Sequence, residues 1–107
     1  MEAYVSLETA KLLQNQGFDW SCGYSYYNNE GRCICSKPTI QMAMAWLRKE
    51  CDLYVDVKYI DYAEHGEVWS VTIVNMLTFT ETDIQETENT YEQAAELGIK
   101  YCLEHLI

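Results

Sequence analysis

The sequence predicts an α+β fold in which a small antiparallel sheet from two β-hairpins packs with three helices. Apolar residues recur with helical spacing in three stretches, and they alternate with period two in the segments between these stretches. Short turn-rich tetrads divide the alternating segments into pairs, which favours hairpins. The expected order is helix, hairpin, helix, hairpin, helix, as a single domain over residues 1–107.

The first helix is expected over residues 6–16. Ser6 is a good N-cap, and apolar residues at positions 7, 10 and 13 fall on one arc of the helix. Gly17 stops the helix because glycine takes the left-handed conformation readily. Phe18 then lies two places past the cap, where it can pack back on Leu13 as in a Schellman ending.

The first hairpin is expected from CGYSYY and RCICS, which flank a four-residue loop at residues 28–31. In that register Tyr26 faces Cys33, Tyr24 faces Cys35, and Cys22 lies on the same face. The three thiols are therefore the candidates for a metal or thiol site. Their spacing, C-x10-C-x-C, matches zinc sites poorly, and free cysteine is readily buried, so core packing is favoured and no metal or cofactor is expected.

Pro38 and Thr39 introduce a second helix, IQMAMAWLRKEC, over residues 40–51. This helix is apolar almost all round as far as Arg48, which predicts deep burial inside the domain or at a subunit contact.

The second hairpin is expected from LYVDVKYIDY and VWSVTIVNMLTF, which flank a turn at residues 64–67. Residues 80–90 are rich in carboxylates and almost without apolar side chains, so they are expected to form an exposed loop. Thr90 opens the last helix, and Gln93 follows three places on as a capping box.

The charge is unevenly distributed along the chain. The sequence holds 17 acids against 7 bases, a formal net charge of -10. Residues 1–49 sum to +1 and residues 50–107 to -11. This balance argues against direct binding of nucleic acid or of an anionic membrane, because both require Lys and Arg. The acidic half is either a solvated face or an interaction surface.

The opening residues lack the pattern of a secretory signal, and no apolar run approaches a membrane-spanning length. The protein is therefore expected in the cytoplasm, with its five cysteines reduced.

No nucleophile motif, HExxH pair, phosphate-binding glycine loop or dinucleotide fingerprint occurs, so no enzymatic activity and no catalytic residue is expected. Tyrosines on the polar side of their elements, acids around the second turn and a small stripe on the last helix mark a candidate interaction surface instead. It consists of Tyr54, Asp56, Tyr62, Glu64, Glu67, Leu97 and Tyr101.

Three segments carry a resemblance: VSLETAKLLQNQGF, PTIQMAMAWLRKE and TYEQAAELGIKYCLEHLI. They are similar to a group of small uncharacterised proteins of prophages and mobile elements in gut bacteria. The resemblance covers the three helices and implies a genomic setting, with no catalytic residues to transfer.

The sequence thus favours a phage-associated, non-enzymatic module that binds another protein, with a homodimer through the second helix or the Leu97 and Tyr101 stripe as one form of such binding. Two alternatives stay open. One is an acidic DNA mimic that inhibits a host nucleic-acid-binding or defence protein. The other is a thiol or metal site at the first hairpin.

Overall fold

The structure of the chain, a computed structural model, describes residues 3–62 and 66–107. It is an α+β fold with three helices and two small antiparallel sheets. In chain order the elements are α1 (Leu7–Asn15), β1 (Ser25–Tyr27), β2 (Cys33–Ser36), α2 (Ile40–Cys51), β3 (Leu53–Tyr62), β4 (Gly66–Asn75), β5 (Glu81–Asp83), α3 (Tyr91–Tyr101) and a π-helical turn (Cys102–Leu106).

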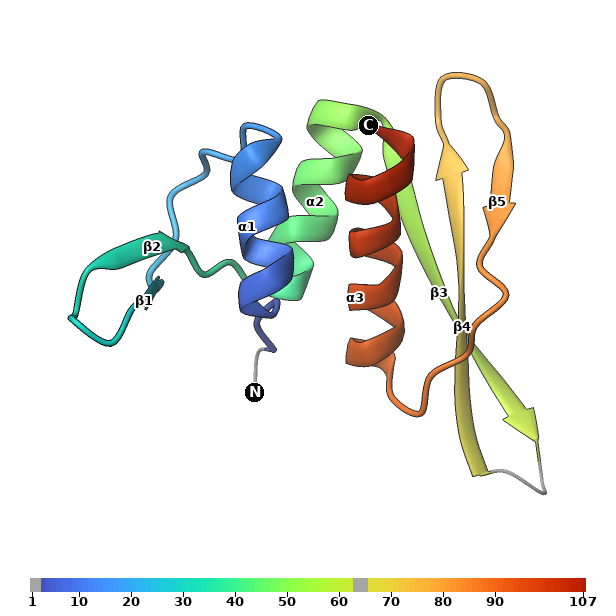
Figure 1. The fold of residues 1–107 in the computed structure, drawn as a ribbon. Helices are drawn as coiled ribbons and strands as arrows, with labels where there is room; N and C mark the ends of the chain where they lie inside the picture. The colour runs from blue at the N-terminus through green and yellow to red at the C-terminus, as the bar shows by residue number, and fades with distance from the viewer. Residues whose placement is uncertain (1–2, 63–65) are drawn as a thin grey trace.

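The two hairpins form separate sheets, so the expectation of one shared sheet is wrong. Strands β1 and β2 pair with each other, and β3, β4 and β5 form the second sheet in that order. Figure 1 shows the two sheets on opposite sides of the helices. The third strand of the second sheet, β5, follows β4 directly in the chain and pairs with its edge, so this edge does not pair with the first hairpin.

All three helices begin at the residues that the sequence indicates. The side chains of Ser6, Thr39 and Thr90 each accept a hydrogen bond from the backbone N–H three residues on. These bonds satisfy N–H groups that lack a partner within the first turn of a helix.

The end of α1 also follows the prediction. Gly17 has a φ of 92°, and its N–H donates to the carbonyl of Gln14. The N–H of Phe18 donates to the carbonyl of Leu13 at 3.0 Å. This pair of bonds is a Schellman ending, which requires the left-handed conformation that glycine adopts without strain.

The register of the first hairpin differs from the prediction. Tyr26 pairs with Cys35 and Tyr27 with Cys33, with an irregularity between the two tyrosines. One cause is Asn28, whose side-chain oxygen accepts the N–H groups of both Glu30 and Arg32 at 2.9 Å. This arrangement enlarges the loop, so that Tyr27 pairs with Cys33. The second cause is an extra residue in β2, Ile34, which lies between Cys33 and Cys35 and moves Tyr26 opposite Cys35.

The long hairpin of β3 and β4 is confirmed, but β4 ends earlier and the following segment is more ordered than expected. Tyr54 pairs with Val74, and the pairing continues regularly to the far end of the hairpin. The chain then turns at residues 76–79 and returns as β5, so residues 80–90 are not simply a loop. Periodicity misses β5 because its three residues carry no apolar alternation.

The core lies between the helices and one face of the large sheet. Gly98 on α3 lies directly over Val55, Val71 and Ile73, so the helix and the sheet approach closely at this point. The apolar surface of α2 is used within the chain, because Ala43, Leu47 and Trp46 are buried in the same core. Of the two environments predicted for α2, the structure shows burial inside the domain.

Candidate functional site

The three cysteines of the first hairpin do not converge. Cys35 is buried, Cys33 is exposed, and Cys22 lies outside the strands with its sulfur 3.6 Å from that of Met42. Burial raises the pKa of the Cys22 and Cys35 thiols, which favours the protonated form over the metal-binding thiolate. Among residues 3–62 and 66–107, no group of three or more His, Cys, Asp or Glu side chains is placed to hold a metal ion.

The predicted interaction surface is divided between two sides of the large sheet. Tyr54 and Asp56 lie on the face turned away from α3, because strand residues alternate and α3 packs on Val55. Glu64 lies outside the described residues, and only the backbone of Tyr62 and Glu67 is described.

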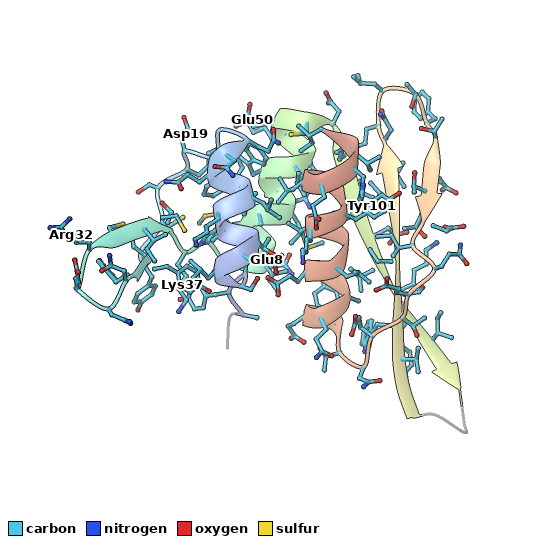
Figure 2. The ribbon with its side chains drawn as sticks, viewed as in Figure 1. Glu8, Asp19, Arg32, Lys37, Glu50 and Tyr101 are labelled. Carbon is cyan, nitrogen blue, oxygen red and sulfur yellow. The ribbon has the colours of Figure 1, made fainter. Side chains whose placement is uncertain are left out.

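Leu97 and Tyr101, by contrast, lie on α3 and are half-buried against the core. Together with Lys100 and His105 they line a shallow hollow of about 270 Å³, and the ring centres of Tyr101 and His105 are 4.8 Å apart. Figure 2 labels Tyr101 on this helix. The predicted residues therefore do not form one surface.

The carboxylates of the acidic half lie on several surfaces. Asp56 and Asp83 flank Thr72 on the outer face of the sheet, and the Thr72 hydroxyl donates to Asp83 at 2.8 Å. Glu104 lies near Lys100 on the side of α3 that faces α1, and Lys100 also pairs with Glu8 at 2.9 Å. Further acids lie near the end of α2. A DNA mimic needs its carboxylates along one surface, so this distribution does not favour that hypothesis.

A different group of exposed side chains gathers at one end of the molecule. Apart from tyrosines, every exposed large apolar side chain among the described residues belongs to this group. We call it the tip surface; its exposed fractions are Met76 36%, Leu77 71%, Phe79 83%, Leu106 39% and Ile107 50%. In Figure 1 the turn between β4 and β5 and the carboxyl end of the chain lie at the same end of the molecule.

The turn that presents Leu77 and Phe79 is held by several hydrogen bonds. The side-chain oxygen of Asn75 accepts the N–H groups of Leu77 at 3.0 Å and Thr78 at 3.1 Å. Its carbonyl accepts the N–H of Phe79, and its N–H donates to Thr80, both at 2.8 Å. An asparagine that closes a turn in this way fixes its conformation, so the apolar side chains are held outward by the backbone.

Phe79 also has an unusual backbone conformation. Its φ is 59°, in the left-handed region that bulky residues rarely occupy. This conformation costs roughly 1–2 kcal/mol for an L-residue. The ring gains no burial in return, because it is 83% exposed. Strained residues of this kind are concentrated at functional sites.

Two hollows adjoin the tip surface. A notch of about 80 Å³ lies between the π-helical turn and the sheet; its lining includes Leu53, Ile73 and Leu106. A groove of about 460 Å³ lies between the ends of α1 and α2, and its lining includes Asp19, Trp46, Glu50, Cys51 and Ile107. Figure 2 labels Asp19 and Glu50 at this end of the helices.

The sequence contains one signal for the tip surface, the asparagine at position 75. This signal is missed when the whole apolar run of residues 68–79 is interpreted as one strand. Met76, Leu77 and Phe79 continue the apolar run of β4, so they are easily assigned to the strand. Asn75 is the indication that the strand ends, because asparagine favours turns. Four residues of largely apolar character directly after it then have to lie in a turn, where they are exposed.

Comparison of the chain with protein-family models, with curated proteins and with solved structures finds no match. Among the helices formed by the described residues, none is both long and apolar enough to cross a membrane.

Proposed function

We propose that the protein is a phage-associated, non-enzymatic module that acts by binding another protein, and that the tip surface is the contact. The observation that carries this proposal is a hydrogen-bonded turn that holds Leu77 and Phe79 in solvent. The phage setting is supported by the resemblance of the three helical segments.

The size of the tip surface supports a role in binding. With roughly 180 Å² as the full area of a large apolar residue, its five members expose about 500 Å². The largest apolar patch on a typical monomer is about 300–600 Å² and is often functional. The three members on the turn after β4, Met76, Leu77 and Phe79, alone expose about 340 Å² by the same measure, which already falls within that range.

The rigidity of the turn is a second argument. A contact that is ordered before binding loses less conformational entropy when the complex forms, so more of its interaction energy contributes to affinity. Leu77 and Phe79 project from a turn whose backbone is already fixed by Asn75. Such preorganised apolar side chains have the character of interface hot spots.

The proposal is tested by capture of partners from a lysate of a bacterium that carries the gene. Three baits are compared: the wild type, the double variant Leu77→Ser/Phe79→Ser, and the control Tyr27→Ser. Tyr27 is 62% exposed on the first hairpin, on the opposite side of the helices from the large sheet. The wild type and the control are expected to retain the same protein, and the double variant to retain at least about ten times less.

Circular dichroism and thermal unfolding of all three baits verify that each is folded. A protein that the double variant retains as well as the wild type does would contradict the tip surface as the contact.

A further inference from the structure

We infer that the segment of the partner that contacts the tip surface is a basic amphipathic helix. This inference rests on the proposed function and specifies the partner's chemistry. The helix places an apolar side chain in the notch, and its Lys or Arg side chains lie in the groove against Asp19 and Glu50.

The notch fits one aliphatic side chain. Leu53 and Ile73, which are 3% and 1% exposed, form its apolar floor. Its volume of about 80 Å³ equals roughly three water molecules at about 30 Å³ each, which is comparable with one branched aliphatic group. Asn75 and Thr80 also line the notch, and they form the base of the turn that carries Leu77 and Phe79.

The two hollows lie close enough along the chain for one short segment of a partner to contact both. Leu106 lines the notch, and the next residue, Ile107, lines the groove, so the hollows lie on either side of one point of the chain. Side chains one or two turns apart on a helix are about 5 or 11 Å apart along the axis. An amphipathic helix docks through a row of such side chains on one face, so we infer a helix as the segment that reaches both hollows.

Charge decides between a basic partner and a second copy of this chain. Asp19 and Glu50 line the groove, whereas no Lys or Arg among the described residues lines either hollow; Arg48 and Lys49 in the last turn of α2 do not. Two copies with a net charge of -10 each repel one another.

The test uses two fluorescein-labelled helical peptides of about 14 residues, measured by fluorescence anisotropy. Both carry Leu on one face; the other positions are Lys in one peptide and Glu in the other. The Lys peptide is expected to bind the wild type, more tightly at low salt than at about 0.15 M. The Glu peptide is expected to bind at least about tenfold more weakly.

Matched charge reversals locate the binding. Glu50→Lys is expected to weaken binding of the Lys peptide at least about threefold more than Glu30→Lys, which makes the same charge change on the exposed loop of the first hairpin. Leu77→Ser/Phe79→Ser is expected to weaken it at least about tenfold. Equal binding of the two peptides, no measurable binding of the Lys peptide, or equal effects of the two charge reversals would overturn the inference.

These outcomes are distinguishable from a failure of the proposed function. If the partner's chemistry is wrong but the tip surface is the contact, the double variant still loses its captured protein while the peptides show no charge preference. A concentration-dependent dimer in light scattering that the double variant abolishes would assign the tip surface to a second copy and overturn the basic helix.

Discussion

Replacement of Gly98 by alanine tests how closely α3 packs on the large sheet. A Cβ atom at this position would lie 2.6 Å from Cγ1 of Val55, 2.7 Å from Cγ2 of Val71 and 3.4 Å from Cδ1 of Ile73. Optimal contacts between carbon atoms are about 3.5–4.0 Å, so the two valine methyl groups would each have to move by about 1 Å. Both valines are fully buried and have few alternative rotamers in a strand.

Two opposing effects determine how far Gly98→Ala changes the free energy of unfolding. Alanine in place of glycine inside a helix gains about 1 kcal/mol from helix propensity. An added methyl group in a packed core costs about 1–3 kcal/mol. Because both nearest contacts are far below the normal distance, we expect the steric cost to dominate and the free energy of unfolding to fall by about 1 kcal/mol.

Thermal and urea unfolding of the wild type and Gly98→Ala measure this change. A loss of about 1 kcal/mol corresponds to a fall in Tm of roughly 4–8 °C for a domain of this size. The variant Val71→Ala removes one of the clashing methyl groups, so the double variant should show a favourable coupling of about 1 kcal/mol. A higher Tm for Gly98→Ala, or no coupling, would refute the close approach of α3 to the sheet.

Three further predictions follow from single residues. The pKa of the Cys102 thiol is raised to about 12, first by burial and then by Cys51 nearby, so the folded state keeps this thiol protonated while the unfolded chain ionises above pH 9.0. The free energy of unfolding should therefore fall between about pH 9 and pH 12 by at most about 1.4 kcal/mol per pH unit, and less steeply in Cys102→Ala; parallel profiles would contradict this. Phe79→Gly relieves the strain of the left-handed backbone but increases the conformational entropy of the unfolded chain, so Tm should stay the same or rise while binding of the partner at the tip surface is lost. A decrease of more than about 1 kcal/mol in the free energy of unfolding would show that the ring stabilises the fold. Thr39→Ala removes the N-cap of α2 and should lower the urea midpoint by the equivalent of about 1 kcal/mol, whereas Thr39→Ser should retain most of it.

The helices could be predicted from the sequence because their signals are local. Ser6, Thr39 and Thr90 each need only a backbone N–H three residues away, so the sequence alone identifies their role. Gly17 ends α1 for an equally local reason. The β3–β4 hairpin was predictable as well, since apolar and polar residues alternate over residues 55–59 of β3 and 69–73 of β4.

The features that could not be predicted depend on contacts between distant segments or on one side chain. In the first hairpin Asn28 enlarges the loop by accepting two N–H groups, and Ile34 is an extra residue in β2; an alternating pattern reveals neither. Strand β5 exists because the turn at residues 76–79 brings Thr82 opposite Ile73. Whether the two hairpins share a sheet depends on which strand pairs with the free edge of β4, and here that strand is β5. The strand propensity of a segment does not indicate which other strand it pairs with.

The tip surface could not be predicted for a different reason, because Phe79 has a backbone conformation and an exposure that its residue type does not favour. At most positions of this fold local preference and tertiary placement agree, as they do for the three helix caps and for Gly17. At Phe79 they conflict twice, since a bulky aromatic residue occupies a left-handed conformation and its ring remains in water. The side chain of Asn75 stabilises this turn by accepting hydrogen bonds from the N–H groups of Leu77 and Thr78. A fold selected for stability alone would favour glycine at position 79, so this conflict supports the proposed binding at the tip surface in addition to the hydrogen-bonded turn.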